Sequence, residues 1–167
     1  MNDSTSVDLY VLRKHEEFIR ELYVDYDPYE DHYFNPNDDL ITQFSFEEIN
    51  YGELHDLGLL EEQGIPYTVE WGKGDEYSQG SQSLRFDSKG NKIKISYYED
   101  ELSIQFLELV KIIKSSHPLD IIKEKVDEMQ RISTPLPWED QEQNAKIYLT
   151  RKLIGANNEC DSTESPR

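Results

Sequence analysis

Four side chains in the first quarter of the chain have the types that bind divalent cations. Asp25, Asp27 and Asp31 offer carboxylate oxygens and His32 offers an imidazole, which are ligands that Mg²⁺ and Mn²⁺ accept. Held together, they would suit a metal-dependent hydrolase, and this is one class of function that the sequence leaves open. The segment does not fit a calcium loop of the EF-hand type, because the positions of a ligand and of an invariant glycine hold other residues.

No other metal or cofactor site is expected. The four histidines show no paired spacing, and the single Cys160 excludes both an intrachain disulfide and a cysteine zinc site. The glycine-rich run 72–80 lacks the ending of a P-loop and the third glycine of a dinucleotide fingerprint, and its Asp75 and Glu76 would repel phosphates. We therefore expect neither a catalytic residue nor a cofactor there.

A longer row of carboxylates favours binding over catalysis. Residues three or four apart on a helix lie about 5–6 Å apart on one face, close to the order of the phosphate repeat of a nucleic-acid strand. Glu17, Glu21 and Asp25 form such a row if the segment is helical. Tyrosines recur among the acids, and tyrosine is favoured at protein interfaces. The expected partner-binding residues are Glu17, Glu21, Asp25, Tyr26, Asp27, Tyr29, Glu30, Asp31, Tyr33, Asp38 and Asp39.

Two plainer interpretations of this segment stay open. The acids can form a solubilising surface that has no partner, and the tyrosines can attach the segment to the core.

The charge of the chain is segregated. Residues 1–80 contain 20 Asp and Glu against 4 Lys and Arg, whereas residues 81–167 contain 15 against 13, for a net charge of -18. This sign disfavours direct binding to nucleic acid or to an anionic membrane, and it favours a basic partner such as a nucleic-acid-binding protein or a nuclease. No apolar run is long enough to span a bilayer, no leader is recognisable, and the lone cysteine suits a reducing cytosol, so we expect a cytoplasmic protein.

The elements that must position these residues follow from periodicity and capping. Apolar spacing after a capping box predicts a helix over residues 6–24, and the prolines and acids of 25–40 predict a loop or a short irregular helix. Residues 41–49 and 65–71 are typical of strands. Between them, Asn50 predicts the start of a helix, and Gly64 its left-handed end.

The second half predicts a hairpin and then helices. Strands are expected over 82–87 and 92–98 around a turn that contains Gly90. A helix capped by Asp100 and another that begins at Pro118 follow, then an extended connector with Trp138 as an anchor on the core, and a last helix over 139–154.

The fold class is therefore α+β, a small and mostly antiparallel sheet of three to four strands with helices packed on one face. We expect one domain over 1–155, with its acidic half at the N-terminus, and a disordered polar tail over 156–167. The oligomeric state stays open, and a homodimer through the helices of 101–131 is one alternative.

Several short motifs resemble small uncharacterised proteins of phages and conjugative elements, over about residues 41–154. The matching residues are Gly64-Ile65-Pro66-Tyr67, Trp71, Gly74, Glu76-Tyr77, Gly80, Leu84-Arg85-Phe86, Leu136-Pro137-Trp138 and Gln141. In size and acidity the chain is also similar to anti-restriction and anti-CRISPR inhibitors that mimic DNA. Its nearly neutral second half departs from the extreme examples, so this resemblance implies a single acidic face and assigns no functional residue.

The sequence thus predicts an inhibitor of phage or plasmid type. Its acidic N-terminal face would mimic nucleic acid and block the basic site of a host defence protein (restriction or CRISPR-like) or of another DNA-binding protein. An immunity protein against a basic nuclease toxin is the nearest alternative, because immunity proteins also alternate tyrosine with carboxylate on their binding surfaces. The metal-dependent hydrolase, and an adaptor with no inhibitory role, are alternatives of other classes.

Overall fold

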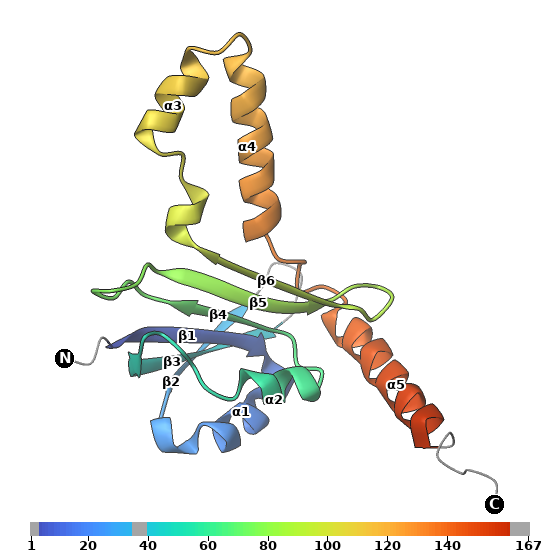
Figure 1. Ribbon diagram of the computed structural model, residues 1–167. Helices are drawn as coiled ribbons and strands as arrows, with labels where there is room; N and C mark the ends of the chain where they lie inside the picture. Colours follow the sequence, from blue (N-terminus) through green and yellow to red (C-terminus); the bar gives the residue numbers. More distant parts are fainter. Residues whose placement is uncertain (1–3, 35–39, 161–167) are drawn as a thin grey trace, which may run out of the picture.

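Six antiparallel strands form one open sheet, to which the helices attach (Figure 1). The computed structural model describes residues 4–34 and 40–160. The strands lie in the order β2-β3-β1-β4-β5-β6. Their bounds are β1 Ser4–Leu12, β2 Tyr29–Phe34, β3 Leu40–Asn50, β4 Tyr67–Trp71, β5 Gly80–Phe86 and β6 Lys92–Tyr98. The α+β class is confirmed, but the sheet is larger than the predicted three to four strands.

The helix predicted over 6–24 is wrong in its first half. Residues 4–12 form β1, which pairs with β3 on one side and β4 on the other. Val7, Leu9 and Val11 alternate with polar residues and are fully buried on one face of the sheet. This period of two is the pattern of a strand that is buried on one side.

The segment predicted as a loop over 25–40 contains a strand. Residues 29–34 form β2, the edge strand, which pairs with β3. Residues 24–26 form a short 3₁₀ turn, η2, and Asp27 after it takes a left-handed backbone (φ 44°), from which the chain enters β2. Tertiary pairing with β3 therefore overrides the low strand propensity of an acidic sequence with prolines at both ends.

Helices α1, α2 and α5 contribute to the core on one face of the sheet. Ile19 from α1, Tyr23 directly after it, Leu60 from α2 and Ala145 from α5 join the buried strand residues in one core cluster. α2 begins later than the predicted cap at Asn50, and the helix expected after Asp100 is divided into a 3₁₀ turn and α3. The remaining bounds are η1 Arg13–His15, α1 Glu16–Leu22, η2 Val24–Tyr26, α2 Leu57–Glu62, η3 Glu99–Leu102, α3 Phe106–Ile113, α4 Pro118–Ser133 and α5 Gln141–Cys160.

A helical hairpin of α3 and α4 stands away from the sheet beyond β6 (Figure 1). Pro118 occupies the first turn of α4, as predicted. α3 buries only Ile112, and α4 buries no residue. The hairpin thus adds little to the core.

Polar side chains attach the C-terminal segment to β5. The carboxamide of Gln141 at the start of α5 accepts from Phe86 N (2.8 Å) and donates to Phe86 O (3.2 Å). On the opposite face of the sheet, buried Arg85 donates to the carbonyl oxygens of Tyr67 and Leu136, and its guanidinium lies 3.6 Å from the ring centroid of Trp138. The predicted anchoring role of Trp138 therefore takes the form of a cation–π contact.

The C-terminal helix is longer than predicted. α5 continues through Cys160, so residues 156–160 of the predicted tail are helical, and residues 161–167 lie outside the described part of the chain. Over the described ranges, we find no helix with the length and apolarity that a membrane span requires.

Candidate interaction surface

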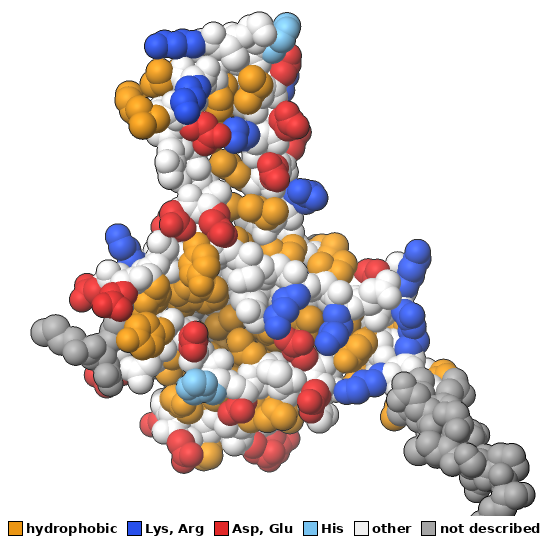
Figure 2. All heavy atoms as spheres, viewed as in Figure 1, with side chains coloured by type: hydrophobic (Ala, Val, Ile, Leu, Met, Phe, Trp, Pro, Cys, Tyr) orange, Lys and Arg blue, Asp and Glu red, His pale blue; other side chains and the backbone are white. Residues whose placement is uncertain are grey.

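Four of the predicted acidic residues lie on α1 and on the turn that follows it. Glu17 and Glu21 are exposed on α1, Asp25 is exposed on η2, and Asp27 is exposed directly after it. Figure 2 shows acidic side chains along the lower edge of the view, where α1 lies. The continuous helical row is not formed, because α1 ends at Leu22 and the 3₁₀ turn carries Asp25. We call Glu17, Glu21, Asp25 and Asp27 the acidic edge.

One predicted residue, Glu30, is engaged within the fold. Arg20 of α1 donates to both oxygens of Glu30 on β2, at 2.6 and 2.7 Å. It also donates to Glu16 at 3.0 Å, and these carboxylates raise the pKa of Arg20. The other oxygen of Glu16 accepts a short hydrogen bond from buried Thr42 of β3. Arg20 therefore attaches α1 to β2 and pairs with two carboxylates that do not belong to the acidic edge.

The carboxylates of the acidic edge are not engaged in ion pairs within the described residues. Within residues 4–34 and 40–160, none of its four carboxylates forms an ion pair. Two exposed apolar side chains accompany them, Val24 at 70% and Tyr29 at 72% of full exposure. The edge thus combines unneutralised charge with contact area, as protein interfaces do.

The other predicted residues have different placements. Tyr26 is half exposed and packs edge-on against Tyr23 and Phe46, with ring centroids 6.0 and 6.1 Å apart. Its ring therefore attaches η2 to the core, as the plainer interpretation supposed. Asp31 is exposed on β2, opposite Gln43 of β3. Tyr33 lies in β2 with its side chain outside the described part, and Asp38 and Asp39 lie outside the described residues.

An aromatic pocket that was not predicted adjoins the acidic edge. Four aromatic side chains from three segments line a cavity of about 350 Å³ on the helix-bearing face of the sheet. Tyr51 and Tyr77 approach to 6.2 Å between centroids, and Trp71 and Tyr98 to 5.8 Å. We call this cavity the aromatic pocket.

Tyr23 joins the aromatic pocket to the acidic edge. Its hydroxyl donates to the backbone oxygen of His55, a residue that lines the pocket, at 2.6 Å. Figure 2 shows an apolar patch over the strands above α1 and α2, on the same face as the acidic side chains. The segment that carries the acidic edge is therefore linked, through buried Tyr23, to a residue that lines the pocket.

The end of β3 and the loop over the pocket have a strained backbone. Glu48 in β3, and Tyr51 and Asp56 in the loop, have φ angles of 57°, 55° and 66°, which residues other than glycine rarely adopt. Gly52, also at positive φ, lies so close that a Cβ atom there would come within 2.8 Å of Trp71. Such strain persists only where surrounding contacts impose it, and it is concentrated at functional sites.

One carboxylate, that of Glu53, lines the aromatic pocket, and Asp56 and Glu76 are sequence neighbours of lining residues. The lining residues include no lysine or arginine. Aromatic faces and carboxylates together bind ammonium or guanidinium groups. The pairs Glu76-Tyr77 and Tyr98-Glu99 were visible in the sequence, but no local pattern showed that Tyr77 and Tyr98 line the same cavity.

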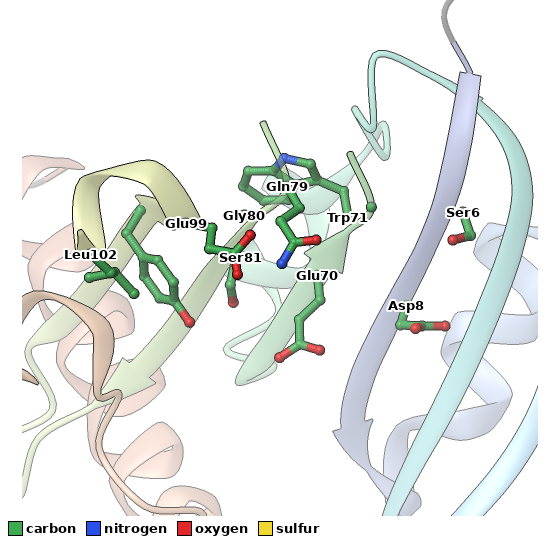
Figure 3. A pocket seen from close by; sticks show the side chains of 11 residues that line it. Ser6, Asp8, Glu70, Trp71, Gln79, Gly80, Ser81, Glu99 and Leu102 are labelled. Atoms are coloured by element: carbon green, nitrogen blue, oxygen red, sulfur yellow. The ribbon is translucent and has the colours of Figure 1, made fainter. Parts of the chain in front are cut away.

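An acidic groove of about 450 Å³ lies on the opposite face of the sheet (Figure 3). Asp8 and Glu70 lie on neighbouring strands at one side, and Glu99 and Leu102 lie at the other. Asp8 accepts from Ser45 at 2.5 Å. Partial burial and the charge of Asp8 raise the pKa of Glu70, although a hydrogen bond from Tyr10 lowers it.

Of the residues of the hydrolase alternative, the side chain of His32 lies outside the described part of the chain. Asp25 and Asp27 belong to η2 and its end, whereas Asp31 and His32 belong to β2. Among the described residues, no group of three or more His, Cys, Asp or Glu side chains is placed to hold a metal ion. The geometry therefore lends that alternative no support.

No protein-family model, curated protein or solved structure matches this chain.

Proposed function

We propose that this chain is an inhibitor of phage or plasmid type. Its acidic edge occupies the basic nucleic-acid site of a host defence protein, restriction or CRISPR-like, or of another DNA-binding protein. One observation carries the proposal: Arg20 pairs with Glu16 and Glu30, while Glu17, Glu21, Asp25 and Asp27 have no ion-pair partner in the described chain. Like charges so close together oppose folding, so an external cation is the favourable partner.

The aromatic pocket adds a specific contact to this long-range attraction. A basic site that grips phosphates presents arginine and lysine side chains. One such side chain can enter a cavity walled by Trp71, Tyr51, Tyr77 and Tyr98, and Glu53 can neutralise its charge. The acidic edge then speeds association, and the pocket slows dissociation.

Charge reversal on the acidic edge tests the proposal. The variant Glu17→Lys/Glu21→Lys/Asp25→Lys is compared with Glu124→Lys/Asp127→Lys/Glu128→Lys on exposed positions of α4, which changes net charge by the same amount. Each protein is immobilised and exposed to host lysate at low and high salt. Because the contact is electrostatic, we expect wild type to capture a basic nucleic-acid-binding protein that salt and duplex DNA release.

The two variants distinguish the effect of the acidic edge on binding from the effect of net charge. The edge variant should lose the captured protein, and the α4 variant should retain it. Capture that duplex DNA cannot displace, or that survives reversal of the edge, would contradict nucleic-acid mimicry by this edge. Circular dichroism of all three proteins checks that the fold is kept.

A further inference from the structure

The α3–α4 hairpin exposes an unusual amount of apolar surface. Four large side chains are mostly exposed, namely Phe106 at 76%, Leu107 at 73%, Ile113 at 61% and Leu119 at 71%. Single exposed apolar residues are common, but several on one small hairpin mark an interaction site.

The spacing of these residues is that of helix-to-helix packing. Phe106 and Ile113 are seven residues apart on α3, and Leu119 and Val126 are seven residues apart on α4. Val126 is also exposed. Each pair therefore lies on one stripe along its helix, two turns long, which can pack against another helix. Such a stripe fits the side chains of a partner helix better than it fits a flat protein surface.

The charge of the hairpin differs from that of the rest of the chain. Residues 106–133 contain five acidic and five basic side chains, so the whole net charge of -18 lies elsewhere. The neutral hairpin does not attract a basic partner. A second copy of this negatively charged chain is repelled less by the hairpin than by the rest of the surface.

Charges within the hairpin also complement each other between copies. α3 with the lysine that follows it carries Glu108, Lys111 and Lys114, a net positive charge. α4 carries four acids, Asp120, Glu124, Asp127 and Glu128, against three bases, a net negative charge. A two-fold axis that places α3 of each copy against α4 of the other pairs opposite charges twice.

We propose that the hairpin is a dimerisation surface, and that two copies of this chain join their α3–α4 hairpins in a four-helix bundle. The stripes of Phe106, Ile113, Leu119 and Val126 form its seam. The acidic edge lies on α1 and η2, away from the hairpin in Figure 1, so each dimer presents two edges. The inference stands independently of the proposed function.

Sedimentation velocity of the purified chain tests the dimer. We expect the chain to form a dimer as its concentration rises to about 100 µM. The dimer should persist at about 0.5 M salt, because salt leaves the apolar seam intact and screens both the repulsion between two negative chains and the attraction between α3 and α4. This response is opposite to that of the acidic edge, whose binding weakens with salt.

The dimer of the variant Phe106→Glu/Leu107→Glu should dissociate ~100-fold more readily, because the change at Phe106 buries an unpaired charge in the seam and the change at Leu107 adds a second charge beside it. Val24→Glu, a matched change at an exposed apolar residue of η2, should leave the dimer intact. A wild type that stays monomeric at the highest concentration overturns the proposal, and so does a dimer that the Phe106 and Leu107 changes do not weaken. Thermal melting of each variant separates dissociation from unfolding.

Discussion

Asp8 on β1 and Glu70 on β4 stand directly opposite each other across two antiparallel strands. Like charges in this register destabilise a sheet, and the raised pKa of Glu70 reflects their proximity together with partial burial. Hydrogen bonds from Ser45 to Asp8 and from Tyr10 to Glu70 offset part of the repulsion. The sheet thus retains an unfavourable pair at the floor of the acidic groove.

Replacing Glu70 by Gln should therefore stabilise the protein. A raised carboxyl pKa means that the folded state loses stability as pH rises through that pKa. The variant should therefore be more stable than wild type at neutral pH. We expect about 0.5 kcal/mol at pH 7, and no gain well below the ordinary value of 4.5. Urea unfolding at both pH values measures it. Equal stability of variant and wild type at pH 7 would show that the hydrogen bonds already compensate the repulsion.

His15, at the start of α1, should make stability fall in mild acid. Burial, and then the charge of Lys14, lower its pKa from 6.5 to about 4, although Glu142 acts in the opposite direction. The folded state therefore favours neutral His15, and this contribution is complete above pH 6.5 and is lost between pH 6.5 and 4. The variant His15→Gln should lose about 2 kcal/mol less than wild type over that window in chemical denaturation. Parallel pH profiles of the two proteins would exclude His15 as the source.

Replacing Arg85 even by lysine should destabilise the protein. Its fork donates to Leu136 O (3.0 Å), Tyr67 O (2.6 Å) and Thr68 Oγ1 (2.9 Å), and it stacks on Trp138. A lysine cannot reproduce this planar set of donors. We expect Arg85→Lys to cost about 2–3 kcal/mol in the free energy of unfolding, because it leaves buried carbonyls without donors.

The matched control for Arg85 is Arg151→Lys. Arg151 is exposed and donates to Lys89 O. This change should cost less than about 0.5 kcal/mol. Similar losses at both positions would mean that burial does not set the value of these contacts.

Two glycines provide a matched test of the loop over the aromatic pocket. Gly52→Ala places a Cβ atom within 2.8 Å of Trp71 at a φ of +66°, so we expect a loss of about 1–3 kcal/mol. Gly58→Ala lies in α2, with no atom near its Cβ position, and should gain up to about 1 kcal/mol. Thermal melts compare the two. A Gly52→Ala variant as stable as wild type would show that the loop can change its conformation freely, and would contradict a loop geometry imposed by its contacts.

Methylguanidinium should bind in the aromatic pocket. In ¹⁵N NMR titrations, we expect the indole signal of Trp71 to shift together with amides of 50–57, because the pocket offers aromatic faces beside Glu53. The indole of Trp138 serves as an internal control, since Arg85 already lies over that ring. Sodium acetate at equal concentration controls for ionic strength. Tyr51→Ala should abolish the shift of Trp71, and shifts spread evenly over the surface would contradict a defined cation site.

Local signals in the sequence predicted much of the fold. The turn around Gly90, with its φ of 73°, the strand within 41–49 and the start of α4 at Pro118 were all expected, because each depends on residues a few positions apart. β1 was missed because apolar residues of two elements, Val11 in the strand and Phe18 and Leu22 in α1, together imitate one helical period.

The sequence by itself determined the excess of acid in the first half and the placement of acids between residues 17 and 31, because composition and neighbouring residues need no fold. Tertiary structure alone decided which acids remain unneutralised, since Arg20 reaches Glu30 only when β2 pairs with β3 beside α1. It also assembled the aromatic pocket, whose walls Tyr51, Tyr77 and Tyr98 are more than twenty residues apart along the chain and meet only through strand pairing. Local patterns cannot encode such a meeting, because contacts between distant segments depend on the register of the whole sheet.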